Sequence, residues 1–479
     1  MRYLKSVVLH PLLFAIFPPI SLAAANTEWT FPDEAIVPTL LCFLIAILLW
    51  FAANLFLKNP AKSGLSVSLF YLFFFSFTAL ESTLVELHFM PGLILPAYLL
   101  LWFVSQIFIL KIKDPDGELN SALNLVSIFL VACNLSFLSG SLWRDLPVIE
   151  GLWKENLPPL AAKAAPADAP DIFYVILDGM ASPKTLKAKF NYDNQQYIDD
   201  LKKKGFYVPT DSHSNYPITA LSLASSLNLR HHRDYLSYRS DLIPAEMIHK
   251  NRLAQLLKSR GYKFIDICSG FSPTDNMPQA DLLFRSSNLS SFDVVLLYRS
   301  ILQGFEPYTG FMQNNSRKTR LNFFEHIKQI KQIEGPKFVL AHVVLPHPPF
   351  LFDRNGSFKS DKYFFLYNID WPKAPYLEQV IFVENKVKAM LEELLPAAKR
   401  PLVMVIQADH GPLLLPEKGR EAKADMFETR MSIFNAYYFS DAQYGRLYNT
   451  VTPVNSFRII LNQYLGEKFQ MLPDLSIWR

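Results

Sequence analysis

Long apolar runs dominate the first third of the chain, and polar positions occur between them only as short breaks. The runs cover Leu4–Ala25, Ile36–Leu57, Leu65–Leu80, Phe89–Leu110 and Ala122–Leu142. A helix needs about 20 apolar residues to cross the hydrocarbon core of a bilayer. Most of the runs reach this length, and the third could reach it by taking in residues on either side. The pattern therefore predicts a transmembrane anchor of about five helices in residues 1–145.

Basic residues are distributed unevenly over the loops between these runs. Positive side chains stand at one set of ends, namely Arg2 and Lys5, Lys58 and Lys62, and Lys111 and Lys113. The opposite loops, 26–35 and 81–88, contain neither Lys nor Arg. The positive-inside rule then places the N-terminus in the cytoplasm and, after five crossings, the rest of the chain outside the cytoplasmic membrane. The first run could instead be a cleaved signal peptide ending near "SLAAAN", which leaves four spans and the same final topology.

The hydrophobic pattern changes after the last apolar run. The stretch "NLPPLAAKAAPADAP" (156–170) is rich in Ala and Pro and lacks periodicity, which predicts a linker over residues 146–170. Residues 171–479 are long enough for one large domain with its own core. Within them, short apolar runs such as "IFYVILDG" alternate with helix-like segments such as "NRLAQLLKSRG". This alternation predicts an α/β domain with a mainly parallel sheet covered by helices on both faces.

Composition and charge agree with a membrane protein. The chain has 479 residues, of which 50% are hydrophobic and 19% charged, and the apolar excess lies in the first third. The formal net charge of +4 is too small to indicate a nucleic-acid partner. Two of the three cysteines lie within the membrane runs, and Cys268 stands alone in the remainder. The outer domain therefore needs no internal disulfide.

Acidic and imidazole side chains stand where two of the predicted strands end. "VILDG" places Asp178 at the carboxyl end of the first strand, and "VIQADHG" places Asp409 and His410 at the end of a late strand. Ligands of parallel sheets collect outside these carboxyl ends. Two carboxylates and an imidazole suit one divalent ion, Zn²⁺ or Mn²⁺. Each signal is weak alone, because an Asp before Gly is commonly a turn residue.

Two further sites carry candidate chemistry. Thr219 opens a helix-like run in "SNYPITALSLASSL", where it could cap the helix or act as a nucleophile activated by a metal or base. His347 lies in "LPHPPF" on a proline-stiffened loop past a strand, where it could bind substrate oxygens or protonate a leaving group. His342, inside that strand, is interpreted as a core histidine.

These motifs resemble the sulfatase-like branch of the alkaline phosphatase superfamily. The resemblance rests on "PDIFYVILDGM", "SNYPITALSLASSL", "LPHPPF", "QADHGP" and "TPVNSFR", which occur in family order from about Pro170 to Leu472. The helical anchor before an outer domain is also similar to lipoteichoic acid synthases and phosphoethanolamine transferases. The resemblance implies that Asp178, Thr219, Asp409 and His410 are metal ligands. It further implies that Thr219 is the nucleophile and that His347 binds the transferred group.

The sequence departs from this pattern in two places. True sulfatases mature a Cys or Ser in C-x-P-x-R or S-x-P-x-R, whereas this chain has Thr219 in "TALSL". Sulfate-ester hydrolysis by that route is therefore not expected. The phosphotransferases commonly have Glu where this chain has Asp178. A second-metal set is not obvious either, so one divalent ion is expected.

The function predicted from the sequence is that of a membrane-anchored, metal-dependent phosphotransferase. It would move a phosphoryl-linked head group from a membrane lipid to an envelope lipid or glycan, and no nucleic acid takes part. Two alternatives stay open at this point. One is a phosphodiesterase or sulfatase-like hydrolase that uses water. The other is a non-catalytic scaffold with the same fold.

Overall fold

The computed structural model describes residues 7–27, 31–112, 117–154, 164–166, 168–232, 242–358, 371–415 and 420–478. The chain divides into two compact units, each described here by itself. The helical unit contains Met1–Trp153 together with Leu289–Asn314, and the α/β unit contains Lys154–Asn288 together with Asn315–Arg479. Residues 155–163 and 167 of the predicted linker, and the first residues of the first apolar run, lie outside the described residues. Residues 146–154 of that linker form the end of a helix that starts at Gly117.

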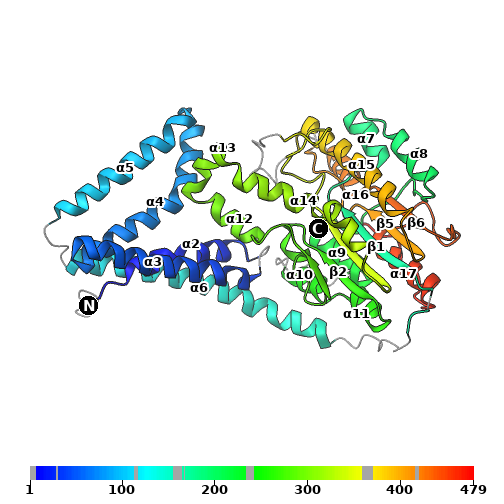
Figure 1. Cartoon of the computed structure of the whole chain (residues 1–479), viewed down its shortest axis with the longest axis horizontal. Helices are drawn as coiled ribbons and strands as arrows, with labels where there is room; N and C mark the ends of the chain where they lie inside the picture. Colours follow the sequence, from blue (N-terminus) through cyan, green and yellow to red (C-terminus); the bar gives the residue numbers. More distant parts are fainter. Residues whose placement is uncertain are drawn as a thin grey trace. The chain divides into compact units, whose positions relative to one another are not determined.

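The helical unit is built from the apolar runs of the sequence (Figure 1). Its first part comprises α2 (His10–Ala25), η1 (Pro32–Ala35), α3 (Ile36–Leu57), α4 (Pro60–Glu86), α5 (Pro91–Lys111) and α6 (Gly117–Lys154). Four described helical ranges are long and apolar enough to cross a membrane, and α2 is a shorter apolar helix. The short third run lengthens into α4, and α6 continues well past Leu142.

The side chains of these helices are arranged for a nonpolar surrounding. Large apolar residues point outward, as at Leu48 and Phe56, which are 67% and 85% exposed. Such a surface would be unfavourable in water and matches lipid tails. The prediction of an apolar helical anchor followed by an α/β domain is confirmed.

A six-stranded sheet forms the centre of the α/β unit. Its strands are β1 (Asp171–Leu177), β2 (Lys263–Ile267), β3 (Leu282–Phe284), β4 (Lys337–Val343), β5 (Leu402–Gln407) and β6 (Asn435–Phe439). Their order in the sheet is β3-β2-β4-β1-β5-β6. All neighbouring pairs are parallel except β5 and β6, which are antiparallel. The mainly parallel sheet is thus confirmed, with an antiparallel edge strand that the pattern did not predict.

Helices cover both faces of this sheet (Figure 1), which is why every residue of β1 and β4 is buried. The main helices of the unit are α7 (Pro183–Phe190), α8 (Gln195–Lys203), α9 (Thr219–Asn228), α10 (Leu242–His249), α11 (Arg252–Ser259), α14 (Phe311–Ile330), α15 (Lys373–Leu394), α16 (Arg420–Met431) and α17 (Pro453–Tyr464), with a short η3 at Ser272–Thr274. One group packs together around α9, with α10, α11 and α17, whereas α15 contacts α7.

The strand order explains where a site can form. β1 lies at the centre, with β4 on one side and β5 on the other, and all three run in the same direction. Their carboxyl ends therefore meet at one edge of the sheet. Near that edge, each of the three strands contains a polar residue or is directly followed by one. Burying a polar group lowers the stability of the fold unless the group finds a hydrogen-bond or ionic partner.

Candidate active site

Asp178 follows β1 directly and is held in a tight turn. Its backbone N–H donates to the carbonyl of Val343 in β4 (3.0 Å), and the next residue, Gly179, has φ +74°. A Cβ atom at Gly179 would lie 2.7 Å from the ring of Trp371, so glycine is required both by conformation and by space. The Tyr376 hydroxyl donates to the carbonyl of Gly179 (2.9 Å), which fixes the turn that presents Asp178.

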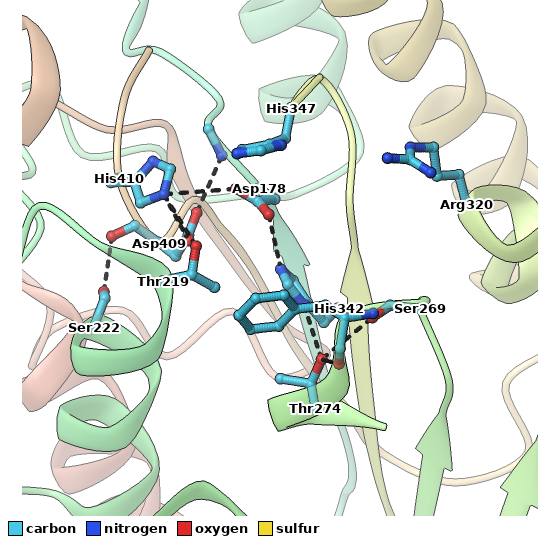
Figure 2. A network of polar contacts seen from close by, with 12 residues as sticks. Asp178, Thr219, Ser222, Ser269, Thr274, Arg320, His342, His347, Asp409 and His410 are labelled. Atoms are coloured by element: carbon cyan, nitrogen blue, oxygen red, sulfur yellow. Dashed lines mark hydrogen bonds and ion pairs between the residues drawn. The ribbon is translucent and has the colours of Figure 1, made fainter. Parts of the chain in front are cut away.

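Asp409 and His410 follow β5 and are almost fully buried. Asp409 Oδ1 accepts a hydrogen bond from the Gly179 backbone N–H (3.1 Å), which ties the ends of β1 and β5 together. His410 Nδ1 lies 3.0 Å from the carbonyl of Gly411, so Nδ1 carries the proton and Nε2 presents a lone pair. That Nε2 lies 3.3 Å from Asp409 Oδ2 and 3.7 Å from Asp178 Oδ1 (Figure 2).

Thr219 is the first residue of α9 and does not cap that helix. The capping position belongs to Ile218, and no side chain makes a capping hydrogen bond there. The Thr219 hydroxyl instead lies 3.1 Å from His410 Nε2 (Figure 2). One turn later, the Ser222 hydroxyl donates to the backbone carbonyl of Asp409 (2.7 Å), which docks the start of α9 against the end of β5. The structure thus brings together Asp178, Thr219, Asp409 and His410, the four residues for which the resemblance implies metal binding.

His342 is buried in β4, but it is not isolated in the core. Its Nδ1 lies 2.9 Å from the Thr274 hydroxyl, and its Nε2 lies 3.3 Å from Asp178 Oδ2 (Figure 2). Ligand atoms of Asp178, His342 and Asp409 lie within 4.8 Å of one another, close enough to hold a metal ion. His342 is therefore buried, as a core histidine would be, but it also belongs to this polar group. Its position inside the apolar strand β4 carries no local signal of this role.

Three polar atoms at the centre of this group have no hydrogen-bond partner within the described part of the chain. They are Asp178 Oδ1, Asp409 Oδ2 and His342 Nε2, all buried. Leaving a buried carboxylate oxygen without a partner costs about 1–3 kcal/mol or more. Two carboxylates and the imidazoles of His342 and His410 are the oxygen and nitrogen donors that Zn²⁺ prefers. The residues therefore fit a divalent cation.

The two carboxyl groups have opposite pKa shifts. Burial alone raises the pKa of Asp178, but the nearby histidines, with His347 the largest contributor, outweigh it and hold that pKa well below its usual range. Burial, followed by the charge of Asp178, raises the pKa of Asp409 to about 7. Because like charges this close cannot both ionise cheaply, the pair favours a cation that neutralises both.

His347 lies on the loop after β4, beside the acidic group. Its Nδ1 lies 2.8 Å from the carbonyl of Pro348, and its ring centre is 5.0 Å from that of Trp371 and 6.4 Å from that of His410. Burial is the main reason that the pKa of His347 is lowered. A half-buried imidazole at this place can contact an oxygen of a bound substrate.

Two arginines that the sequence did not identify as functional residues add positive charge. Arg430 is buried and donates from Nε to the carbonyl of Pro217 (2.7 Å) and from Nη1 to that of Gly411 (2.7 Å). It thereby braces the loops that carry Thr219 and His410. Arg320 in α14 donates to the carbonyl of Pro348 (3.2 Å), the residue after His347. Figure 2 shows the side chains of Arg320 and His347. Both arginines lie in helices, Arg430 in α16 and Arg320 in α14, and the sequence of neither helix gives a local signal of this role.

The family model described as Sulfatase matches residues 170–455, more than half of the chain. No curated protein matches the chain significantly. Solved structures that resemble it include the periplasmic domain of EptC from Escherichia coli in complex with Zn, with 14% identity, a TM-score of 0.43, and coverage of 64% of this chain and 86% of that one.

Two further structures show a similar degree of likeness. Integral membrane lipooligosaccharide phosphoethanolamine transferase A (EptA) from Neisseria meningitidis has 14% identity and a TM-score of 0.42, with 97% of this chain and 95% of that chain covered. BT1596, a 2-O GAG sulfatase, has 11% identity and a TM-score of 0.40, with 65% and 73% covered. The chain is assigned to a family by the match to the family model, and not by these structural likenesses.

Proposed function

Because the chain belongs to the sulfatase family, we propose that it is a membrane-anchored, metal-dependent transferase with Thr219 as its nucleophile. Its substrate would be a phosphodiester lipid of the cell envelope, and it would pass the phosphoryl-linked head group to an envelope lipid or glycan. The observation that carries this proposal is the convergence of Thr219 with Asp178, Asp409 and His410 on one spot that leaves buried ligand atoms without partners.

We assign the ion-binding role to Asp178, Asp409, His410 and the Thr219 hydroxyl. Zn²⁺ is the favoured ion because imidazole nitrogen accompanies the carboxylates, and Mn²⁺ is the alternative. When bound, the ion would favour the alkoxide form of Thr219 and offset negative charge on the phosphoryl group. His342 acts as a positioning residue, since its Nε2 contacts the Asp178 oxygen opposite the one that faces His410.

The reaction proceeds in two displacement steps. Thr219 Oγ forms a bond to phosphorus while the bond from phosphorus to the donor's alcohol oxygen breaks, and that alcohol leaves with a proton. The acceptor hydroxyl then attacks phosphorus, loses its proton, and releases Thr219. The N-terminus of α9 contributes favourable potential for the negatively charged phosphoryl group throughout. With Nδ1 donating to the Pro348 carbonyl, His347 reaches a phosphoryl oxygen or the leaving alcohol through Nε2. Nε2 donates only when the imidazole is protonated, a form that the negative charge of a bound phosphoryl group favours.

The membrane helices give a reason for a lipid donor. A catalytic unit covalently joined to a helical anchor stays near the bilayer, which raises the effective concentration of a lipid substrate without new contacts. The arrangement of basic residues supports a catalytic unit on the extracytoplasmic side of the cytoplasmic membrane, with α2 as a further span.

The nucleophile is tested with full-length protein in lipid nanodiscs, loaded with zinc. The probes are bis(p-nitrophenyl) phosphate and fluorescent phosphatidylethanolamine and phosphatidylglycerol. We expect Thr219→Ala to lose at least about 10³-fold in turnover of a probe that the wild type accepts. Thr219→Ser should retain part of that turnover, and mass spectrometry should detect a peptide that carries the phosphoryl-linked head group at the substituted position. Full turnover by Thr219→Ala would refute the proposed nucleophile.

The same assay separates transfer from hydrolysis. An added lipid A or glycan acceptor should gain the mass of the head group if the enzyme is a transferase. Release of free head group alone, unchanged by any acceptor, would show that water is the acceptor and that the enzyme is a hydrolase.

A further inference from the structure

One segment of the outer part of the sequence belongs to the helical unit. Residues Leu289–Asn314 stand between β3 and most of α14 in the chain, yet they cluster with the membrane helices and not with the sheet. The segment forms α12 (Ser291–Tyr298), η4 (Ile301–Phe305) and α13 (Glu306–Thr309), and it ends in the first residues of α14. We define it as the docking segment.

Specific contacts hold the docking segment to the apolar helices. The Thr78 hydroxyl in α4 lies within hydrogen-bond distance of two carbonyls of the segment, those of Tyr298 (2.8 Å) and Ser300 (3.2 Å). At Gly304, a Cβ atom would lie 2.8 Å from the ring of Phe77, so η4 rests against α4 with no room for a side chain. These contacts are side chain to backbone and ring to backbone, which requires close packing.

Apolar clusters extend the same attachment. Phe292 and Leu296 of α12 form a buried cluster with Leu22, Ala23 and Ala35. Ile301 packs against a second cluster made of Phe77, Ile94 and Tyr98. One face of the docking segment is therefore part of the apolar core of the helical unit.

All of these contacts fall at one end of the helices. Ala23 lies near the end of α2, Ala35 just before α3, and Ile94 near the start of α5. Thr78 lies eight residues before the end of α4 at Glu86, about 12 Å at 1.5 Å per residue. One leaflet of hydrocarbon is about 15 Å thick. The contacts of Thr78 thus lie within about one leaflet's thickness of the end of α4.

The other side of the docking segment presents large apolar side chains. They are Val295, Leu302, Phe305, Tyr308 and Phe311, which are between 37% and 79% exposed. Arg299 is exposed among them. Apolar residues beside a cation, at the level where helices leave the hydrocarbon, match the acyl chains and phosphate groups of phospholipids. In water the same patch would be unfavourable.

We propose that the docking segment is an interfacial membrane element whose apolar side chains sink into the outer leaflet, with Arg299 at the level of the lipid phosphates. The occupant of this face is the bilayer itself. The proposal rests on the attachment of the segment to α2, α4 and α5, and it holds whichever reaction the enzyme catalyses. The part of the chain that follows α6 would then contact the bilayer through a second segment, which is distant from α6 in the sequence.

Depth-dependent quenching tests the proposal in the full-length protein. Single cysteines are introduced by Leu302→Cys, Phe305→Cys and Tyr308→Cys after the native cysteines are replaced, and each is labelled with an NBD fluorophore in vesicles of phosphatidylethanolamine and phosphatidylglycerol. Tyr308 is the most exposed of the patch, so its replacement disturbs packing least. Lipids with a nitroxide at acyl carbon 5 should quench these labels at least about twofold more than lipids with a nitroxide at carbon 12.

Two controls bracket the result. Leu48→Cys, exposed at mid-length of α3, should be quenched more by the carbon-12 nitroxide. Ala398→Cys, an exposed position after α15, should respond only to aqueous iodide. Labels on the docking segment that behave like Ala398→Cys would overturn the proposal. So would labels shielded from both lipid nitroxides and iodide together with energy transfer between copies, because a second copy would then cover this face.

Discussion

Replacing Asp409 with Asn is expected to stabilise the protein when metal is removed, although the same change should abolish tight metal binding. The reason is the crowding of two carboxyl groups in a buried place. Burial and the charge of Asp178 raise the pKa of Asp409 from 3.8 to about 7. At pH 8 without metal, the folded protein must nevertheless keep Asp409 largely ionised. An uncharged amide of the same shape removes that repulsion.

The magnitude follows from the pKa. One pKa unit corresponds to about 1.4 kcal/mol, so ionising Asp409 in the metal-free fold costs on the order of 4 kcal/mol. The folded state binds the proton more tightly than the unfolded state, and the stability of the metal-free protein should therefore fall as pH rises from about 4 to about 7. A buried amide still lacks partners for some of its atoms, so we expect Asp409→Asn to recover about 2 kcal/mol at pH 8.

Thermal unfolding of the full-length protein in detergent, with excess EDTA at pH 8, measures this effect. A gain of about 2 kcal/mol in an α/β unit of this size should raise Tm by about 3 °C. Adding zinc should raise the Tm of the wild type and leave Asp409→Asn unchanged. A lower Tm for Asp409→Asn than for the wild type in EDTA would refute the reasoning.

Asp266→Asn is the matched control for this experiment. Asp266 is buried in β2, accepts a hydrogen bond from the Met277 backbone N–H (3.0 Å), and has a pKa raised by burial. In the sheet, β4 separates β2 from β1. Asp266→Asn should therefore keep the full response to zinc.

Three further changes should produce distinct results. His342→Ala should lower zinc affinity by about 10- to 100-fold in isothermal titration, because Asp178 loses the contact that orients it; unchanged affinity would exclude the positioning role. Gly411→Ala should lower the free energy of unfolding by about 3 kcal/mol in denaturant titration and weaken zinc binding, because its Cβ would lie 2.3 Å from the carbonyl oxygen of Thr429. Asp171→Ala should destabilise the fold by about 3 kcal/mol, since it strands the buried ammonium of Lys337, which lies 2.5 Å from Asp171 Oδ2; zinc affinity should stay unchanged.

A structural feature could be predicted from the sequence wherever a single continuous segment contains the pattern that specifies it. Apolar runs such as Ile36–Leu57 coincide with α3, because crossing a bilayer requires only length and hydrophobicity. Asp178 and the Asp409–His410 pair could be placed at strand ends because a continuous apolar run followed by a glycine turn marks a buried strand and its end. Parallel strands align these ends, so it could be predicted that these three residues lie near one another.

Tertiary structure decided the features that depend on neighbours in space. His342 faces Asp178 because β4 lies beside β1 in register, with His342 opposite Ile176. Arg430 reaches the carbonyls of Pro217 and Gly411 only because three distant loops converge. The docking segment joined the helical unit through contacts of Thr78 and Phe77 with residues more than 200 positions away. Hydrophobic pattern reports which side of an element is buried, but it does not report which partner buries it.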